Sequence, residues 1–354
     1  MDLIKRMDLA LRAPTEEIVT REELKELFET NAHPTHYIGF ELSGLLHAGF
    51  IMAAFKINDL IEAEVKCKVY LADWHSVINN KFGGDWNKIK KAAEYFADAF
   101  QFFCPGVETV LGTDLYHCND EYWKQVILFG KQITLARDVR CLAIMGRTEK
   151  EKLDVAQYLY PLMQAVDIHA IGADIAHAGI DQRKVHMLAR EVYPKLGWKK
   201  PVALHHHLLP GLGEPARLGF EEDKKADEVL SSKMSKSKPQ NCVFIHDSEQ
   251  EILAKMQKAY CPPSAEGNPV LEFAKHLVFH EFDSVDVERE QKYGGDVTFE
   301  NYEQLEQHYA AGKLHASDLK NAVAQHLNKI VSPLRAHFEK KKNLLDAFRE
   351  GTTR

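Results

Sequence analysis

Tyr37-Ile-Gly-Phe-Glu-Leu-Ser-Gly-Leu-Leu-His-Ala-Gly-Phe50 is the stretch of sequence that decides the fold. It opens with a short apolar run typical of a strand and passes through the turn residues Ser43 and Gly44 to His47. A helical pattern follows at once, with apolar residues at Ala53 and at four, seven and eight positions beyond it. The stretch therefore predicts a strand, a tight turn and a helix N-terminus, a junction that favours phosphate through its N–H groups and the helix dipole.

His47 and Gly49 are the residues of this turn that suit a nucleotide. The imidazole can donate to phosphate, and the glycine lets a ring or a phosphate approach the backbone closely. Gly39, on the expected strand, would leave similar room. An ordinary first β-α unit whose histidine caps a turn explains the same residues equally well.

The segments that follow repeat the pattern of strand and helix. Cys67–Asp73 and Val107–Gly112 are short apolar runs, and between them Asp85 is placed to N-cap a helix with an apolar stripe from Ile89 to Phe100. This order predicts right-handed crossovers and a Rossmann-like parallel sheet, the α/β class. The first 30 residues indicate a helical preface, with a capping box at its second helix.

Residues 117–165, approximately, form a mostly helical insertion between the two halves of the sheet, with a charged break at 147–152. Ile127, Leu128 and Ile133 in this insertion are candidates for a homodimer interface. The alternative is that they pack on their own sheet.

The composition shifts after about Cys242, so we expect a first domain at 1–242 and a second domain at 243–354. Ser248 and Glu251 make a capping box, and helical patterns run over 268–279, 301–310 and 317–345. We therefore expect the second domain to be all-helical. The charged segment 214–230 is expected to be a disordered surface excursion.

The composition is that of a globular protein of 354 residues with a net charge of −7. There is no apolar run long enough to span a membrane and no apolar signal region at the N-terminus. The six cysteines form no Cys-x-x-Cys pair, which indicates reduced thiols in a cytoplasmic protein. We expect no metal at His205-His-His207, because successive side chains on a strand face opposite ways. The acidic balance argues against a dedicated nucleic-acid binder, so any RNA contact must come from local patches.

Two downstream stretches carry chemistry. Lys233-Met-Ser-Lys-Ser237 lies in a loop of small residues and lysines that has no helical or strand period. Tyr160, Gln164 and Asp167 fall on one helical face that offers a phenol, an amide and a carboxylate. A solvated basic loop and the solvent side of a helix explain these stretches as well, although the polar face has weakly polar neighbours, which favours a pocket.

Together these motifs resemble the tyrosyl-tRNA synthetases of the archaeal and eukaryotic type, among the class I aminoacyl-tRNA synthetases. The His-x-Gly at 47–49 and the loop at 233–237 match the two class signatures in order. The likeness runs from about Thr35 to about Arg335. It includes Tyr-Ile-Gly-Phe-Glu at 37–41, Leu-Ala-Asp at 71–73, Tyr-Pro-Leu-Met-Gln at 160–164, Gln-Arg-Lys-Val-His-Met-Leu-Ala-Arg-Glu at 182–191, Lys-Ala-Tyr-Cys-Pro at 258–262, Tyr-Gly-Gly-Asp at 293–296 and Asp-Leu-Lys-Asn-Ala-Val at 318–323.

The resemblance implies how each end of L-tyrosine is held. Tyr37 and Asp167 would hold the substrate phenol, and Tyr160, Gln164 and Gln182 its amino end. A buried hydrogen-bonding site of this kind can reject phenylalanine by a factor on the order of 10⁴–10⁵, and this enzyme class is itself the standard example.

The implied reaction is adenylation of tyrosine by ATP, followed by transfer to tRNA(Tyr). Catalysis would rest on positioning and phosphate stabilisation by His47, Gly49, Lys233 and Lys236, with Mg²⁺ as the ATP complex. The full set of ATP-binding residues implied by the resemblance is Gly39, His47, Gly49, Lys233, Met234, Ser235 and Lys236. The lysine loop is expected to close over ATP.

The resemblance also implies RNA contacts in the second domain. Tyr293 would stack on the first anticodon base, with His315 and Asp318 beside it. In the insertion, Arg140 is the nearest match to an arginine that contacts the acceptor end, and Arg137 competes with it.

One position departs from the signature, since Phe50 stands where the family usually has a histidine. This predicts a slower step rather than an inactive enzyme. Three other functions fit parts of the sequence: a tryptophanyl-tRNA synthetase, a non-catalytic RNA-binding paralogue, and a nucleotidyltransferase for a small cofactor. The first conflicts with the tyrosine-type residues, the second with the retained lysines, and the third with the C-terminal domain.

Overall fold

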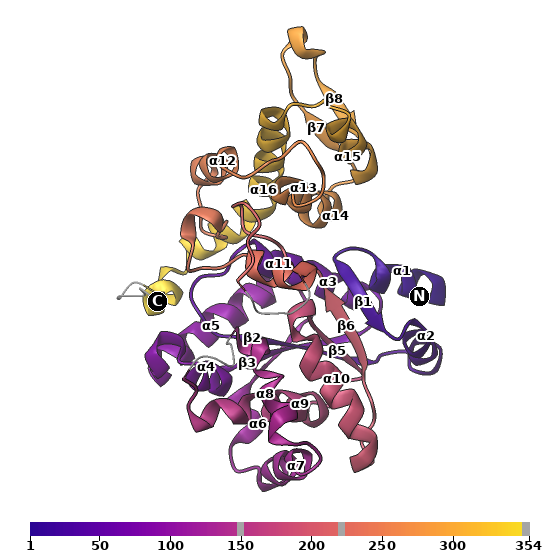
Figure 1. Ribbon diagram of the computed structural model, residues 1–354, viewed down its shortest axis with the longest axis vertical. Helices are drawn as coiled ribbons and strands as arrows, with labels where there is room; N and C mark the ends of the chain where they lie inside the picture. Colours follow the sequence, from indigo (N-terminus) through magenta and orange to yellow (C-terminus); the bar gives the residue numbers. More distant parts are fainter. Residues whose placement is uncertain (147–151, 219–223, 349–354) are drawn as a thin grey trace. The chain divides into compact units, whose positions relative to one another are not determined.

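The structure is a computed structural model that describes residues 1–146, 152–218 and 224–348 (Figure 1). Contacts divide the chain into two compact units, which are described separately below. Unit 1 comprises Met1–Gly44, Lys56–His207 and the segment that begins at Asn343, and unit 2 comprises Leu45–Phe55 and Leu208–Lys342. The domain boundary at residue 242 remains a prediction from composition.

Unit 1 is built on a six-stranded sheet, counted over the described residues. Its strands lie in the order β1 (Thr15–Val19), β6 (Val202–His206), β5 (Ile175–Gly179), β2 (Thr35–Glu41), β3 (Lys66–Ala72) and β4 (Glu108–Leu111). All neighbours are parallel except β1, which pairs antiparallel with β6. The predicted Rossmann-like α/β sheet is therefore confirmed, with β2 at its centre between β3 and β5.

The expectation of a purely helical preface is wrong because it missed β1. The first 30 residues contain α1 (Leu3–Leu11), the edge strand β1 and α2 (Arg21–Thr30). The capping box of α2 is present, with Thr20 accepting from the Glu23 N–H at 3.2 Å. An edge strand needs only one partner, and five residues give too little alternation to be recognised in sequence.

Several helices cover the sheet of unit 1. They are α4 (Asp73–Ile78), α5 (Trp86–Phe103), α6 (Gly112–Tyr116), α7 (Asp120–Gly130), α8 (Leu135–Val139), α9 (Tyr160–Ala170) and α10 (Arg183–Val192). Asp85 caps α5 by accepting from the N–H groups of Asn87 and Lys88, as predicted. In the insertion, Ile127 and Leu128 are exposed, whereas Ile133 packs against the core of unit 1. The charged break predicted at 147–152 lies almost entirely outside the described residues.

Unit 2 is mostly helical. Its helices are α11 (Lys224–Ser232), α12 (Glu249–Gln257), α13 (Pro269–Phe273), α14 (Phe279–Glu281), α15 (Tyr302–Ala310) and α16 (Ala316–Glu339), and α3 (Ala48–Glu62) begins here and continues into unit 1. The all-helical expectation needs one correction, because β7 (Val285–Val287) and β8 (Val297–Phe299) form a two-stranded antiparallel sheet. Part of the predicted excursion is helical as α11, and 219–223 lie outside the described residues. No helix in the described ranges is long and apolar enough to cross a membrane.

A row of buried histidines crosses one face of the sheet of unit 1, and a buried pair of histidines lies on the other face. On one face, His36 Nε2 lies 2.9 Å from His177 Nδ1, and His177 Nε2 lies 2.8 Å from His206 Nδ1. On the other face, His186 Nδ1 lies 3.0 Å from His205 Nε2. His205 and His206 thus face opposite ways, as the alternation of a strand requires. Burial lowers the pKa of His36 to about 3 and that of His177 well below its usual value, so these rings are neutral.

Candidate active site

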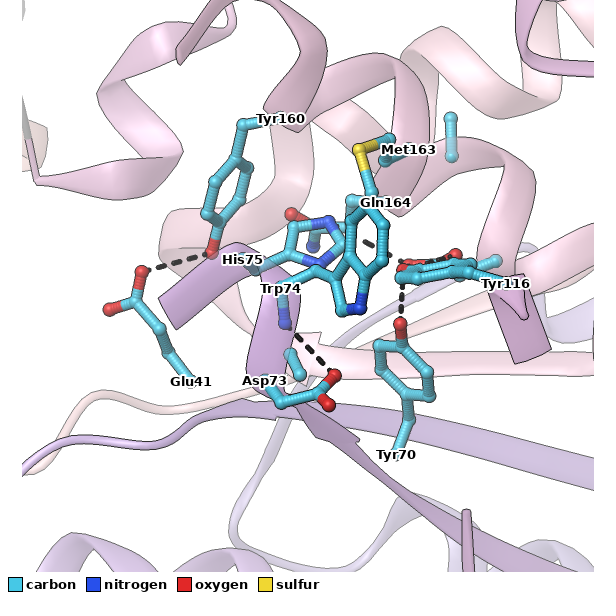
Figure 2. A network of polar contacts seen from close by, with 12 residues as sticks. Glu41, Tyr70, Asp73, Trp74, His75, Tyr116, Tyr160, Met163 and Gln164 are labelled. Carbon is cyan, nitrogen blue, oxygen red and sulfur yellow. Dashed lines mark hydrogen bonds and ion pairs between the residues drawn. The ribbon is translucent and has the colours of Figure 1, made fainter. Parts of the chain in front are cut away.

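Asp167 on α9 is the centre of a buried cluster of phenols in unit 1. Its carboxylate is fully buried and accepts from the Tyr122 hydroxyl at 2.7 Å and from the Tyr116 hydroxyl at 2.9 and 3.1 Å. The Tyr70 hydroxyl in turn is hydrogen-bonded to the Tyr116 hydroxyl, as Figure 2 shows. A buried carboxyl group requires such partners, because polar oxygens removed from water without hydrogen bonds are costly.

The pKa of Asp167 is raised to about 8, chiefly because burial disfavours its charged form. The hydroxyls of Tyr122, Tyr116 and Tyr70 oppose this shift, and the nearby charge of Asp73 adds to it. His75 Nε2 lies 3.7 Å from Asp167 Oδ2, but burial lowers the pKa of His75 to about 3. The ring is therefore neutral, and Asp167 is held by hydroxyl dipoles rather than by a cation.

Tyr37 on β2 belongs to the same buried cluster of unit 1. Burial and the negative charge of Asp167 raise its pKa, so its hydroxyl keeps its proton and can donate. A Cβ at Gly39 would lie 2.6 Å from the Tyr37 hydroxyl oxygen. Gly39 therefore makes room for the phenol of Tyr37, a different local role from the nucleotide contact that the sequence predicts.

A chain of amides begins one turn before Asp167. Gln182 Nε2 donates to the carbonyl of Ile144 at 2.9 Å, and Gln164 Nε2 donates to Gln182 Oε1 at 3.2 Å. These bonds fix the orientation of both amides and leave Gln164 Oε1 buried without a hydrogen-bond partner among the described residues. Tyr160 lies at the same end of α9, and its hydroxyl donates to Glu41 Oε1 at 3.3 Å (Figure 2). An open, buried amide oxygen is suited to a donor such as an ammonium group.

His47, at the start of α3, belongs to unit 2. Its ring Nδ1 accepts from the Gly49 N–H at 3.1 Å, so the proton of the neutral ring is on Nε2. A Cβ at Gly49 would lie only 2.8 Å from the His47 ring. Burial, and then the charges of Lys236 and Lys233, keep the pKa of His47 well below its usual value. Phe50 is buried, so its side chain belongs to the core.

Backbone hydrogen bonds bring the two signature motifs together within unit 2. Ala48 N–H donates to the carbonyl of Val243 at 2.9 Å, and Ile245 N–H donates to that of Leu46 at 3.1 Å. The His47 turn is thereby paired with the segment just after the lysine loop.

The lysine loop itself is held by its backbone and by one side chain. Met234 N–H donates to the carbonyl of Leu209 at 2.9 Å, and the Met234 side chain is buried. Lys233 is exposed and Lys236 half-buried, and the hydroxyls of Ser235 and Ser237 lie 2.9 Å apart. These contacts fix the loop from which both lysines extend.

The predicted RNA contacts lie in two units. In unit 2, Tyr293 is 62% exposed, with Lys292 Nζ 4.8 Å from its ring centre. His315 is the N-cap of α16, and Asp318 lies in the first turn of that helix. Arg289 was missed in sequence; its guanidinium donates to the carbonyls of Gly295 and Lys313 and ties the Tyr293 loop to the turn before α16.

Of the two arginines in the insertion, Arg137 lies 3.3 Å from Glu191, whereas Arg140 is exposed. Sequence reasoning also missed three phenols of the Asp167 cluster: Tyr70, Tyr116 and Tyr122. They come from three separate segments, and nothing in their spacing relates them to α9. The only available signal was the position of Tyr70 near the end of an expected strand.

Comparisons with known proteins identify the family. The family model for class I tRNA synthetases (W and Y) matches residues 29–332. The chain is 45% identical to the tyrosine–tRNA ligase of Thermococcus gammatolerans and 44% identical to that of Pyrococcus abyssi, over 99% of this chain and 98–99% of each relative.

Solved structures agree with this. The tyrosyl-tRNA synthetase of Pyrococcus horikoshii, complexed with L-tyrosine, superposes with a TM-score of 0.93 at 44% identity, covering 99% of this chain and all of that one. The tryptophanyl-tRNA synthetase of Aeropyrum pernix reaches a TM-score of 0.68 over 92% of this chain and 84% of that one, but at 16% identity, which shows the shared fold alone. The chain therefore belongs to the class I tRNA synthetase family for tryptophan and tyrosine.

Proposed function

We propose that Asp167 and Tyr37 bind the phenol of L-tyrosine, and that Tyr160, Gln164 and Gln182 bind its ammonium group. The activity of the chain is that of a tyrosine–tRNA ligase, given the identity to such enzymes over its whole length. What is proposed is the assignment of roles to individual side chains.

The observation that carries this assignment is that α9 presents two different buried polar groups, one turn apart. A buried carboxylate among phenols lies at Asp167, and an open, buried amide oxygen lies one turn away at Gln164. The first suits a hydroxyl and the second suits an ammonium group. Tyrosine carries both groups at opposite ends of one rigid side chain, whereas tryptophan offers no hydroxyl to the carboxylate.

The first step is attack by the tyrosine carboxylate on the α-phosphorus of ATP. A bond forms between a carboxylate oxygen and phosphorus, the bond to the β-phosphate oxygen breaks, and pyrophosphate leaves. The nucleophile is already an anion, so no general base is needed. The second step transfers the tyrosyl group to a terminal ribose hydroxyl of tRNA and releases AMP.

His47, Lys233 and Lys236 stabilise the phosphates in this assignment, and Gly49 fixes the His47 ring. The Nε2–H of the neutral ring donates to phosphate oxygen without adding charge, and the lysines supply the positive charge. Met234 positions the lysine loop through its buried side chain, and Ser235 does so through its hydroxyl. Mg²⁺ enters with ATP as part of that substrate.

In the second domain, Tyr293, His315 and Asp318 read the anticodon, with Tyr293 stacking on a base. Arg140 contacts the acceptor end, since Arg137 is paired with Glu191. Replacing Tyr293 by Ala is expected to raise the KM for tRNA about tenfold and to leave pyrophosphate exchange unchanged. A variant that lost exchange as well would contradict the assignment.

Two further parts of the proposal concern assembly and location. The exposed Ile127 and Leu128 form the centre of a homodimer contact. Charged residues at both positions should therefore convert the dimer to a monomer, which sedimentation measurements would detect. The location is the cytoplasm, consistent with the free cysteines.

The test is amino-acid-dependent ATP–pyrophosphate exchange with tyrosine and with tryptophan. We expect exchange with tyrosine and none with tryptophan. Asp167→Asn should lower kcat/KM for tyrosine by about 10³-fold or more, because it replaces one acceptor oxygen by an NH₂ group that cannot accept from a hydroxyl. Asp138→Asn, which removes another buried carboxylate of unit 1 on α8, is the matched control. Exchange with tryptophan would favour the other specificity of the family, and a folded protein without any exchange would favour a non-catalytic paralogue.

A further inference from the structure

The segment after α16 belongs to unit 1 and is anchored there by an aromatic ring. Its residues 343–348 lie in the short helix η9 (Lys342–Phe348), and Ala347 in this helix is 3% exposed. The centre of the Phe348 ring lies 5.0 Å from that of Tyr95 on α5 and 5.8 Å from that of Phe82. The segment therefore packs against α5 and against the turn that precedes α5.

That turn, η1 (Lys81–Gly84), has an unusual backbone. Asn80 just before it has a φ of 55° and Phe82 within it a φ of 51°, in the left-handed region that residues other than glycine rarely adopt. Such a conformation persists only where surrounding contacts hold it. The Phe82 ring contacts Phe348, so the segment after α16 is one of the supports that keep this turn in shape.

The same turn supplies two donors to Glu41 at the end of β2. Asn79 Nδ2 donates to Glu41 Oε1 at 2.7 Å, and Lys81 Nζ lies 2.9 Å from Glu41 Oε2. Asn79 is 2% exposed and also donates to the carbonyl of Met145 at 3.2 Å. Asn79 and Lys81 are two positions apart, on either side of a left-handed residue. The shape of the turn therefore decides whether both oxygens of Glu41 are held at once.

Glu41 in turn fixes the hydroxyl proton of Tyr160, which donates to Glu41 Oε1 at 3.3 Å (Figure 2). A phenol has one proton, and its remaining hydrogen-bonding capacity is that of an acceptor. With the proton directed at Glu41, the buried oxygen of Tyr160 offers its lone pairs to another donor. Burial and the charge of Glu41 raise the pKa of Tyr160, so the phenol stays neutral. An ammonium group can only donate, and it requires this orientation of the phenol.

We propose that Phe348 is a positioning residue of the tyrosine site, which acts on the ammonium end of the substrate through η1, Glu41 and Tyr160. Phe348 holds the turn, the turn holds Glu41, and Glu41 orients the hydroxyl of Tyr160. The segment after α16 thereby contributes to the affinity for the amino acid. The inference rests on the proposed role of Tyr160 as a partner of the substrate ammonium group.

The test is Phe348→Ala with two ligands, measured by isothermal titration calorimetry without ATP. L-Tyrosine carries the ammonium group, whereas 3-(4-hydroxyphenyl)propionate has the same phenol and carboxylate and lacks it; the second ligand is measured through its competition with tyrosine. We expect the Kd for tyrosine to rise about fivefold, as for the loss of one well-oriented hydrogen bond, and the Kd for the propionate to stay within a factor of two. Partial unfolding would lower the fraction of protein that binds and would leave both Kd values unchanged.

Three further variants sharpen the test. Phe348→Tyr keeps the ring and should bind tyrosine as the wild type does. Phe82→Ala should reproduce the loss, and adding Phe348→Ala to it should weaken tyrosine binding no further, because the two rings act in series. Phe102→Ala is the matched control, since it removes a 39% exposed ring at the end of α5 that is farther from η1.

Two results would overturn the inference. An unchanged Kd for tyrosine in Phe348→Ala would show that the ring only packs, and an equal weakening of both ligands would show that it supports the site as a whole. Either result leaves the proposed function intact. If the wild-type protein bound tyrosine and the propionate with equal affinity, the ammonium role of Tyr160 would be wrong, and the inference about Phe348 with it.

Discussion

Asp167 in unit 1 and the lysines of unit 2 are polar groups of the site that their surroundings hold in opposite ways. The carboxylate is fully buried, and side chains from several elements hold it through their hydroxyls. Lys233 is exposed and Lys236 half-buried, and the loop that carries them is held through its backbone and the buried Met234. The Asp167 carboxyl group is fixed by hydrogen bonds from its neighbours, whereas the two lysines extend from a loop that is fixed through its backbone and Met234.

This difference in burial and support fits the two tasks of selecting the amino acid and stabilising phosphate. Selection of an amino acid by one hydroxyl needs buried groups whose hydrogen bonds are fully accounted for. Stabilising a phosphate that enters and leaves with each turnover needs cations that water can reach between turnovers. The unit 1 cluster is therefore expected to tolerate few changes in shape, and the unit 2 loop few changes in charge.

Among the variants that test this comparison, the largest effect should come from removing a loop charge. Lys236→Met keeps the length of the side chain and deletes its charge, so exchange should fall by about 10²–10³-fold. The Kd for tyrosine, measured by calorimetry without ATP, should stay the same. A parallel loss of tyrosine binding would contradict the comparison, because the unit 2 lysine would then also affect the binding of the amino acid.

A smaller effect should appear in the pH dependence of stability. The folded pKa of His36 is lowered to about 3, so the unfolded chain binds the proton first as pH falls below about 6.5. The free energy of unfolding should therefore decrease on acidification, by about 2 kcal/mol between pH 6.5 and pH 5 for this ring alone.

Urea unfolding at pH 7.5 and pH 5.0 measures this loss. His36→Gln should reduce the difference between the two pH values by about 2 kcal/mol, whatever it does to stability at pH 7.5. His33→Gln, at an exposed histidine, is the control and should leave the difference unchanged. An equal difference in His36→Gln and the wild type would show that the buried ring does not carry the acid sensitivity.

The smallest effect should come from a pair of glycines. A Cβ at Gly112 would fall 2.7 Å from the Tyr70 hydroxyl and would also strike Asp73, whereas a Cβ at Gly49 would strike the His47 ring. Gly112→Ala should weaken tyrosine binding about tenfold, and Gly49→Ala should lower exchange by a similar factor at unchanged tyrosine affinity. If both variants impaired the same measurement, tyrosine binding and phosphate stabilisation could not be assigned separately to unit 1 and unit 2.

Local chemistry explains which parts of the fold the sequence predicts well. The caps at Thr20, Asp85 and Ser248 are present as expected, because a cap is decided by residues two or three positions apart. The strands β2, β3 and β4 lie on the short apolar runs that predict them. The three-residue strands β7 and β8 are too short for any period to appear, so an all-helical domain was the wrong expectation.

The candidate site likewise has a part that the local sequence predicts and a part that only the tertiary structure shows. Tyr160, Gln164 and Asp167 could be placed together because one helix carries all three. The partners that hold Asp167 could not, because Tyr70, Tyr116 and Tyr122 meet it only through the packing of a strand and two helices around α9. Distances across a fold are set by tertiary structure, which no spacing along the chain encodes.

The row of imidazoles from His36 to His206 has a polarity. Each neutral ring has one proton, so neighbouring rings must all donate in the same sense. His36 Nδ1 is buried without a partner among the described residues, and a proton there would point at nothing that can accept it. The protons therefore sit on Nε2 of His36 and of His177, and each ring donates toward β6. Nitrogen-15 chemical shifts would report this order as a single tautomer along the row, so that an uncharged row of rings has a built-in direction from β2 to β6.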